Sequence, residues 1–400
     1  MLTLSETLQL LNALQPATRP VENVPLQAAR GRISAQPVLA GHALPPFDNS
    51  AMDGYALAVL DTETVRYRLA GALAAGSSEG LQLQPGQACR IFTGAPLPAG
   101  CKSVIAQENV QVEGSDILCK EKPKPGQHMR LVGSELASGK QLLEAGEKIR
   151  PLYIGLLAAQ GITTLQVYSP LRVGVLSTGN ELQQPGQPLQ SGQIYDANRP
   201  QLLALLSTCG FSALDLGKVP DDATATRELL QTAAAQCDVI ISTGGASVGD
   251  ADHVRQVVSQ LGSIKHWKVA IKPGKPFAFG RVESKPFFAL PGNPAAAVIT
   301  FLLIALPWLH HAAGAHFVPF KSSVLPLAQA VANHDTRTLY LRGIYRDKDS
   351  QSLQLEPLAE QSSAALISLA QAQVLIEVPP QAEFYPGELV CYHDLAQMLS

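Results

Sequence analysis

The spacing of apolar and polar residues along the chain changes near residue 171. From about residue 20 to 140, short apolar runs such as YRLAGAL and SVIAQENV are interrupted repeatedly by glycine or proline. That pattern predicts small β-rich modules rather than alternating strands and helices. Residues 1–15 instead have the apolar spacing of an amphipathic helix, with Thr3 or Ser5 as its N-cap.

Compact apolar runs alternate with helical stretches between residues 171 and 318. RVGVLST and CDVIIST have the length and β-branched content of buried strands, and helical stretches such as DDATATRELLQTAAAQC lie between such runs. Strands that alternate with helices predict a parallel sheet covered by helices. The most apolar stretch, at 295–309, is shorter than a membrane span and contains Pro307, so we expect a buried helix there.

The pattern returns to short β-like runs after about residue 320. The predicted fold class is therefore α/β and β multidomain, with a central parallel α/β domain between β-rich N-terminal modules and a C-terminal β domain. The predicted divisions are an N-terminal helix at 1–20 packing on the α/β domain, a linking module from 21–42 and 140–170, an irregular β-rich domain at 43–139, the α/β domain at 171–318 and the C-terminal β domain at 319–400.

Composition and charge narrow the classes of function. Lys and Arg total 30 against 33 Asp and Glu, a formal net charge of −3, which argues against a strongly basic nucleic-acid binder. The six cysteines form no C-x-x-C motif, so we expect reduced thiols rather than structural zinc or a disulfide framework. The N-terminus has no signal-peptide pattern. These features together predict a cytoplasmic protein.

Glycine-rich turns follow three of the predicted strands in the α/β domain. Ligands of open α/β sheets bind beyond the carboxyl ends of the strands, where these turns lie. The backbone N–H groups of such turns suit a phosphate, although glycine after a strand is often only a turn. The candidate substrate-binding residues in these turns are Ser177, Thr178, Gly179, Ser242, Thr243, Gly244, Gly245, Ser247, Pro291 and Gly292.

Two lysines stand close together in the stretch VAIKPGKPFAFG. Lys272 and Lys275 are flanked by two prolines, which restrict the backbone around them. Ammonium groups presented in this way suit an oxyanion or a pyrophosphate. The alternative interpretation is a pair of solvated loop lysines.

Three carboxylates accompany these cations. Glu181 follows the first glycine turn, Asp222 precedes a predicted helix and Asp252 follows the second turn. Carboxylates beside a phosphate site typically bind Mg²⁺, which takes one or two of them together with phosphate oxygens and water. Each also has a simpler interpretation, as a charge at a helix start or as an N-cap. Together with the anion-binding turns they predict a magnesium–phosphate site.

A further acidic residue stands in PPFDNSAMDGYAL, at residues 45–57. The turn residues of this stretch explain how the chain reverses, and Phe47, Met52 and Tyr55 can anchor it to a core. Neither feature explains why a carboxylate is presented at the turn. Asp53 is therefore a candidate catalytic residue.

The motifs of this chain resemble, in order and spacing, those of the MoeA family of molybdopterin molybdenumtransferases, which includes the gephyrin E domain. They are PFDNSAMDGYA, RIFTGAPLPAGC, GVLSTGNEL, GQIYDANRP, ISTGGASVGDADHV, AIKPGKPFAFG and ALPGNPAA. The resemblance implies an elongated homodimer whose α/β domain is similar to the molybdopterin adenylyltransferases, with a site shared across the dimer. It also implies Mg²⁺-dependent insertion of molybdate into adenylated molybdopterin, with release of AMP and active molybdenum cofactor.

The resemblance implies roles only where the residues match. Arg337, in RTLYLRG, resembles the arginine of the family's C-terminal motif, and Ser362 lies in a segment similar to a Q-G-S motif, so both join the substrate-binding residues. Glu181, Asp222 and Asp252 are the implied Mg²⁺ ligands. The implied catalytic residues are Asp53, Thr93, Glu181, Asp222, Asp252, Lys272 and Lys275.

The resemblance also implies partners, and two other functions stay open. A second copy of the chain, a molybdopterin adenylyltransferase and molybdoenzyme chaperones are the expected protein partners, whereas nucleic acid and membrane are not expected. One alternative is a non-catalytic scaffold or carrier of the cofactor, because gephyrin also serves in assembly. Another is a hydrolase of nucleotide phosphates. The acidic residues and lysines favour the enzyme, since a scaffold would not need them.

Overall fold

The computed structural model describes residues 1–14, 16–58, 65–77, 80–219, 222–244, 253–348 and 352–399, without the side chains of His253, His266, Trp267 and Lys348. The chain divides into two compact units, and each is described by itself. Unit 1 comprises Met1–Ala35, Gly146–Pro151 and Thr164–Ser400, and unit 2 comprises Gln36–Ala145 and Leu152–Thr163.

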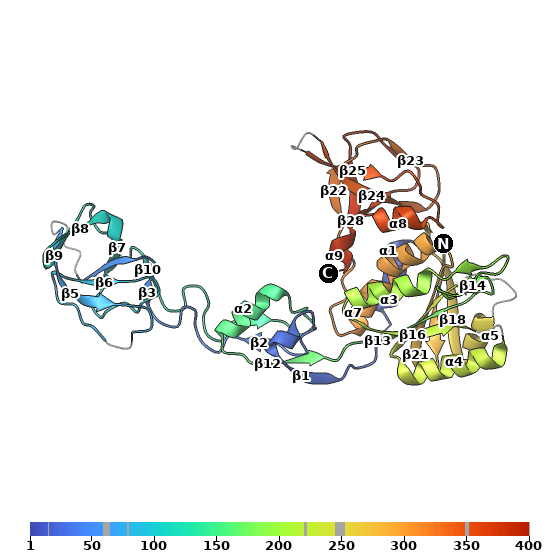
Figure 1. The fold of residues 1–400 in the computed structure, drawn as a ribbon, viewed down its shortest axis with the longest axis horizontal. Helices are drawn as coiled ribbons and strands as arrows, with labels where there is room; N and C mark the ends of the chain where they lie inside the picture. Colours follow the sequence, from blue (N-terminus) through green and yellow to red (C-terminus); the bar gives the residue numbers. More distant parts are fainter. Residues whose placement is uncertain are drawn as a thin grey trace. The chain divides into compact units, whose positions relative to one another are not determined.

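Unit 1 is built on a six-stranded central sheet of order β16-β13-β17-β21-β20-β18 (Figure 1). The predicted parallel α/β arrangement is confirmed for β16, β13, β17 and β21, and β20 and β18 extend the sheet through two antiparallel pairings. Only Glu283 and Ser284 separate β20 from β21. A connection this short can form only an antiparallel hairpin, because a parallel crossover needs a dozen or more residues. The strands are β13 (Arg172–Ser177), β16 (Ser212–Lys218), β17 (Val239–Thr243), β18 (Gly262–Lys268), β20 (Pro276–Val282) and β21 (Lys285–Leu290).

Helices cover both faces of the central sheet. Side chains alternate between the faces along each strand, so Ile241 of β17 joins one apolar core and the neighbouring Ile240 joins the other. The first core lies under α3 (Asn198–Thr208) and a long C-terminal helical segment, and the second lies under α4 (Ala223–Gln236) and α5 (His253–Leu261). The result is a three-layer unit with the strand ends free to carry loops.

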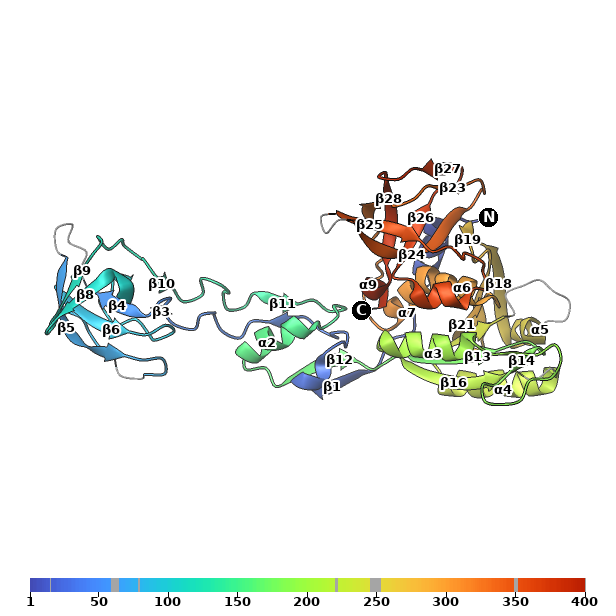
Figure 2. The same ribbon diagram turned by 45° about the horizontal axis from the view of Figure 1, so that its top comes forward.

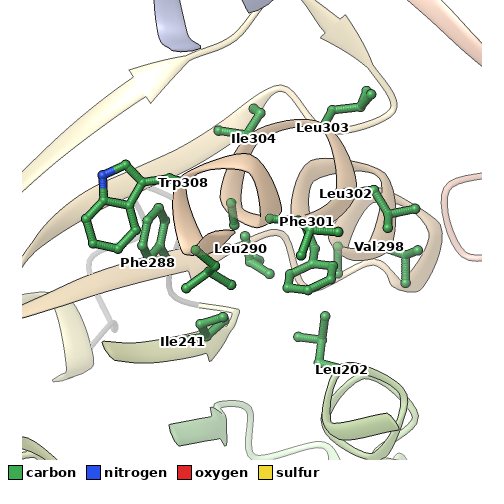
Figure 3. Close-up of a cluster of buried hydrophobic side chains, with 14 of the residues drawn as sticks. Leu202, Ile241, Phe288, Leu290, Val298, Phe301, Leu302, Leu303, Ile304 and Trp308 are labelled. Atoms are coloured by element: carbon green, nitrogen blue, oxygen red, sulfur yellow. The ribbon is translucent and has the colours of Figure 1, made fainter. Parts of the chain in front are cut away.

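The long helical segment contains α6 (Pro294–Thr300), the π-helical turn η3 (Phe301–Ala305) and α7 (Leu306–Ala312). Its apolar side chains, among them Phe301 and Trp308, pack against Phe288 and Leu290 of β21 (Figure 3). By length and composition, Pro294–Ala312 is apolar enough to cross a membrane, but 89% of its most apolar window is buried inside the protein. The predicted buried helix is therefore confirmed.

The N-terminal helix, α1 (Leu4–Asn12), begins at the predicted cap Thr3. The Thr3 hydroxyl accepts from the Glu6 backbone N–H, and the Glu6 carboxylate accepts from that of Thr3, which forms a capping box. Leu11 is fully buried in the first core of the central sheet. The following chain pairs β1 (Val21–Pro25) with β12 (Thr164–Tyr168).

A second sheet in unit 1, the C-terminal sheet, has the order β19-β24-β26-β28-β22, with β25 beside β24 (Figure 2). β19 comes from the chain between two central-sheet strands, so its pairing with β24 joins the two sheets. Its strands are β19 (Ile271–Lys272), β22 (Ser323–Pro326), β24 (Thr338–Lys348), β25 (Ser352–Pro357), β26 (Val374–Val378) and β28 (Leu389–Asp394). The same part of the chain contains a separate pair of strands, β23 (Val331–Asn333) and β27 (Ala382–Phe384), and the helices α8 (Leu366–Gln371) and α9 (Leu395–Leu399).

Unit 2 contains a six-stranded sheet of order β7-β4-β6-β5-β9-β8. Its buried side chains form two clusters, one containing Tyr55, Tyr67 and Ile105, the other containing Ile91 and Val104. The elements are β2 (Val38–Leu39), β3 (Asn49–Ser50), β4 (Gly54–Leu57), β5 (Arg66–Leu73), β6 (Gln87–Ile91), β7 (Ser103–Ala106), the turn η2 (Gln107–Asn109), β8 (Val110–Glu113), β9 (Asp116–Cys119), β10 (Met129–Arg130), β11 (Gln141–Leu143) and α2 (Pro151–Ala159).

Candidate active site

A pocket of about 1220 Å³ lies in unit 1, where loops from the ends of β13, β17 and β21 meet residues of the C-terminal sheet. Its position agrees with the general rule that ligands of α/β sheets bind beyond the carboxyl ends of the strands. Of the predicted residues, Gly245, Ser247 and Asp252 lie outside the described residues. The predicted residues that line the pocket are Thr178, Glu181, Thr243, Lys272, Lys275, Pro291, Gly292, Arg337 and Ser362.

Backbone hydrogen bonds tie the three strand-end turns together. The Thr178 N–H donates to the Thr243 carbonyl (3.1 Å), and the Gly244 N–H donates to that of Leu290 (3.0 Å). Gly244 has a φ of 87°, and a Cβ on it would collide with the Thr178 hydroxyl. Ser177 and Ser242, although predicted to bind substrate, are fully buried and do not line the pocket. The turns thus form one connected floor.

Glycine at position 179 gives the Glu181 carboxylate its place at the pocket wall. Gly179 has a φ of 141°, and a Cβ on it would lie 2.5 Å from Glu181 Oε2. The Glu181 carbonyl accepts from the Ile194 N–H (2.8 Å), which pairs β14 (Leu182–Gln183) with β15 (Ile194–Tyr195). Both the turn and the pairing therefore fix the segment that carries Glu181.

We expect Gly179→Ala to displace Glu181 and to lower the catalytic rate at least tenfold. Gly186→Ala is the matched control, because Gly186 also has a positive φ (91°) but a Cβ there meets nothing within 4 Å. Both variants should lose a similar amount of stability to backbone strain, about 1 kcal/mol or somewhat more. Activity and thermal midpoint would be measured for both variants. Equal activities would contradict this role of Gly179.

The PGNP turn after β21 is held from both sides. Asn198 Nδ2 donates to the Gly292 carbonyl (2.7 Å), and Asn293 Nδ2 donates to Ser363 Oγ (3.0 Å). The Ala295 N–H donates to the Ser363 carbonyl (2.9 Å). Ser363 thus connects the central sheet to the segment that also carries Ser362.

Lys272 and Lys275 flank Pro273 and Gly274 in a tight loop of the pocket wall. The Val269 N–H donates to the Lys275 carbonyl (3.0 Å), which closes the loop. A Cβ on Gly274 would lie 2.5 Å from Thr300 Oγ1 of α6, so only glycine lets the loop rest on that helix. Both ammonium groups belong to exposed residues that line the pocket, as an anion site requires.

Asp335, which the sequence analysis did not single out, lies between two of the predicted cations. It forms a bidentate pair with Arg337 (3.0 and 2.7 Å) and lies 3.4 Å from Lys272 Nζ. Hydrogen bonds from the Arg337 side chain hold the pKa of Asp335 well below its ordinary value. The charges of Arg337 and Lys272 are therefore partly neutralised, whereas Lys275 forms no ion pair among the described residues.

Arg342 is a second residue that sequence reasoning missed. Its side chain is fully buried, with Nε donating to Ser368 Oγ (3.0 Å) and Nη2 to the carbonyls of Glu360 and Ser362. Burial lowers its pKa, yet an arginine stays charged in proteins. It forms no ion pair in the described part of the chain, and its Nη1 has no hydrogen-bond partner there. The charge of Glu360 acts on Arg342, and the guanidinium ties the segment that carries Glu360 and Ser362 to β24 behind the pocket.

Two other buried polar atoms at the pocket lack partners among the described residues. They are Asn198 Oδ1 and Thr243 Oγ1, and both residues line the pocket. Buried polar groups are almost always paired, and the exceptions in a protein need an explanation. A bound ligand or ordered water at this pocket would provide the missing partners.

The described residues offer one free carboxylate for a metal ion at the pocket. Glu181 lines it, whereas Asp222 is the N-cap of α4, where its carboxylate accepts from the Ala225 N–H (2.6 Å), and does not line it. No group of three metal-ligating side chains occurs in the described ranges. One carboxylate nevertheless fits Mg²⁺, which commonly uses one or two of them with substrate phosphates and water.

Asp53 and Thr93 meet in unit 2, at the ends of two neighbouring strands. The backbone N–H and hydroxyl of Thr93 both donate to Asp53 Oδ1 (2.7 and 2.8 Å). These bonds, the backbone one above all, lower the pKa of Asp53 below its ordinary value. The exposed carboxylate is therefore ionised at neutral pH, with Oδ2 unpaired within the described structure. It can accept a proton but holds none to donate.

Known proteins match this chain over nearly its whole length. The MoeA N-terminal region (domain I and II) matches residues 2–161, the probable molybdopterin binding domain 174–311 and the MoeA C-terminal region (domain IV) 324–395. A molybdopterin molybdenumtransferase of Haemophilus influenzae is 36% identical over 385 residues, which cover 94% of each chain. The chain belongs to the molybdopterin molybdenumtransferase family. The resemblance seen in the sequence motifs is thus confirmed.

Other members of the molybdopterin molybdenumtransferase family support the same assignment. That of a Nostoc species is 37% identical over 374 residues, covering 90% of this chain and 85% of the relative. The crystal structure of a MoeA protein from Pyrococcus horikoshii shares 26% identity and superposes with a TM-score of 0.84, covering 98% and 100% of the two chains. Membership places this enzyme in molybdenum cofactor biosynthesis.

Proposed function

We propose that this enzyme inserts molybdate into adenylated molybdopterin, with release of AMP, and so forms active molybdenum cofactor. The observation that carries the proposal is the pocket in unit 1, which is lined by the cationic side chains of Lys272, Lys275 and Arg337. Molybdate is a dianion and the pterin substrate carries phosphates, so both substrates need such cations. A non-catalytic carrier would need to bind the pterin only.

The anion-binding role is assigned to the lysine loop, to Arg337 and to the floor of strand-end turns. Lys275 supplies an ammonium group that forms no ion pair with any described residue, whereas Lys272 and Arg337 share Asp335 and so present a weaker net charge. The turn residues Thr178 and Thr243 add hydroxyl groups at the floor. An oxyanion and a phosphate chain can then be held at separate places in a pocket of about 1220 Å³.

Mg²⁺ is proposed to be held by Glu181 together with phosphate oxygens of the substrate. When bound, it would polarise the phosphoryl oxygen and neutralise charge at the phosphoanhydride. Asp222 and Asp252 stay predictions for this role. The Asp222 carboxylate already caps α4, and Asp252 lies outside the described residues, so neither supports the proposal. The proposal therefore depends on Glu181 alone.

Asp53 is proposed to accept a proton during insertion. Its lowered pKa keeps the carboxylate ionised, and Thr93 fixes one oxygen so that the other is presented to a partner. The sequence marked Asp53 only as a candidate catalytic residue, and a proton acceptor is a more specific role. We also propose that the enzyme is a cytoplasmic homodimer, as the family resemblance implies.

The test is AMP release from adenylated molybdopterin, measured with and without molybdate. We expect AMP to appear only when both molybdate and Mg²⁺ are present, and to stop when EDTA removes the metal. AMP release that is independent of molybdate would contradict the proposal and favour a phosphate hydrolase. Tight pterin binding without any AMP release would favour a carrier.

A further inference from the structure

Arg90, on β6 of unit 2, is attached to the Asp53 turn by several interactions. Its Nη1 donates to the Gly54 carbonyl (2.7 Å) and, more weakly, to that of Ile91 (3.3 Å). Its Nη2 donates to Gln107 Oε1 (2.6 Å). The guanidinium therefore spans the strand that follows Asp53, its own strand and the turn η2.

Aromatic rings fix the plane of the same guanidinium. Its central carbon lies 4.6 Å from the centre of the Phe92 ring and 5.2 Å from that of Tyr55. Tyr55 is the direct cross-strand partner of Arg90, and Phe92 directly precedes Thr93. A planar group held between rings and carbonyls loses little further freedom when it forms its hydrogen bonds.

The Asp53–Gly54 turn is held on its other sides as well. The Gln107 N–H donates to the Asp53 carbonyl (3.1 Å). Gln107 therefore contacts the turn directly through its backbone and indirectly through its side chain, which accepts from Arg90. A Cβ on Gly54 would collide with the Ile105 carbonyl of β7, because β4 lies tightly between β6 and β7. β4 and β6 are paired directly, with Gly54 opposite Ile91, and Arg90 adds a side-chain link from β6 to the Gly54 carbonyl at the Asp53 turn.

We propose that Arg90 is a positioning residue, which holds the Asp53–Gly54 turn in register with Thr93 so that the carboxylate is presented in one orientation. It acts through Asp53 and not on the substrate, and the inference rests on the proposed function of Asp53. A lysine at this place would keep the charge but could not reach two carbonyls and an amide in a fixed plane.

The charge of Arg90 has a separate effect on Asp53. After the hydrogen bonds from Thr93, it is the charged group that lowers the pKa of Asp53. The other titratable side chains on the neighbouring elements are the buried Tyr55 of β4, the buried Cys89 of β6 and Glu108 of η2, and β7 carries none. Loss of the arginine charge therefore raises the pKa of Asp53. Because the activity needs the ionised carboxylate, the acid limb of the pH–rate profile then moves to higher pH.

Two substitutions separate the fixed geometry from the charge. We expect Arg90→Lys to lower kcat about ten- to a hundredfold with KM unchanged, because misplacing a reacting group has effects of that size. Because lysine keeps the positive charge, the acid limb of the pH–rate profile of this variant should stay near that of the wild type. Arg90→Met should show the same loss of kcat and, in addition, an acid limb moved to higher pH.

Two further variants keep the test independent of folding. Arg66→Met is the matched control, because Arg66 lies on β5 of the same sheet and forms exposed ion pairs with Glu113 and Asp116. It should change neither kcat nor the pH profile. Gln107→Leu leaves Arg90 in place but removes its Nη2 partner, and should lower kcat by a smaller factor.

Four quantities are measured for each variant of the whole chain: kcat, KM, the pH profile and the thermal midpoint. A lowered midpoint with wild-type kcat per folded molecule in the Arg90 variants would overturn the inference and leave only a structural role. If Asp53→Asn abolishes activity while the Arg90 variants match Arg66→Met, the inference fails and the proposed function stands. An active Asp53→Asn variant would overturn both.

Discussion

Replacing Asp53 by asparagine is expected to lower the rate of molybdenum insertion by about 10²- to 10⁴-fold, the range for a group that transfers a proton. Asparagine is nearly isosteric and can keep the hydrogen bonds that Thr93 donates to Oδ1. It cannot accept a proton, because its amide is not basic. The rate of AMP release in the presence of molybdate measures the loss.

Controls for Asp53 come from the same unit. Thr93→Val removes the hydroxyl hydrogen bond but keeps the backbone one, so it should raise the pKa of Asp53 and lower the rate far less than Asp53→Asn. Asp116→Asn, on β9, removes an exposed partner of Arg66 and should leave the rate unchanged. A wild-type rate for Asp53→Asn, with the fold intact, would contradict the role assigned to this carboxylate.

Replacing Lys275 by methionine should be the most damaging single change in the anion pocket. Its ammonium group forms no ion pair in the described part of the chain, so its whole charge is available to the substrate. A hydrogen bond to a charged group contributes about 1.5–3 kcal/mol, which corresponds to a loss of affinity of roughly 10- to 150-fold. Titration with molybdate and with AMP measures which anion has lost its partner.

Lys272→Met is the informative comparison for Lys275→Met. Asp335 lies 3.4 Å from Lys272 Nζ, and once the lysine is removed this carboxylate still pairs with Arg337. We therefore expect a smaller loss than for Lys275. Lys321→Met, an exposed lysine away from the pocket lining, should have no effect. A larger loss for Lys272 than for Lys275 would contradict this account of the pocket charges.

Much of the fold could be predicted from local patterns. The strands RVGVLST and CDVIIST and the helices between them are visible as apolar periodicities, and the N-cap Thr3 is visible as a capping-box residue. The antiparallel hairpin of β20 and β21 was not foreseen, although its two-residue connection is visible at Glu283 and Ser284. The pairing of β19 with β24 could not be foreseen, because it joins segments more than sixty residues apart.

The candidate site was predictable where chemistry follows the chain locally. The strand-end turns and the two lysines carry their signal in neighbouring glycines and prolines. Asp335 carries no such signal, because Lys272, one of the two cations that it joins, lies far away in the sequence. Arg342 was missed for a different reason: it lies on β24, which also carries exposed or half-buried charged residues, so its charge gives no sign that this side chain is buried.

Asp222 illustrates the opposite case, in which the simpler interpretation has direct structural support. The sequence offered both a helix-start charge and a metal ligand, and the structure places its carboxylate on the Ala225 N–H as an N-cap. A carboxylate in that position is engaged by the helix itself. The proposal for Mg²⁺ accordingly uses Glu181, whose carboxylate lies at the pocket.

The most direct test of the central claim is the number of molybdenum atoms bound to pterin for each AMP released. The enzyme would be incubated with adenylated molybdopterin, Mg²⁺ and molybdate, and the product would be assayed by metal analysis and by its ability to activate a molybdenum-free apoenzyme. We expect one molybdenum per AMP and an active cofactor. AMP release that yields metal-free pterin would contradict it.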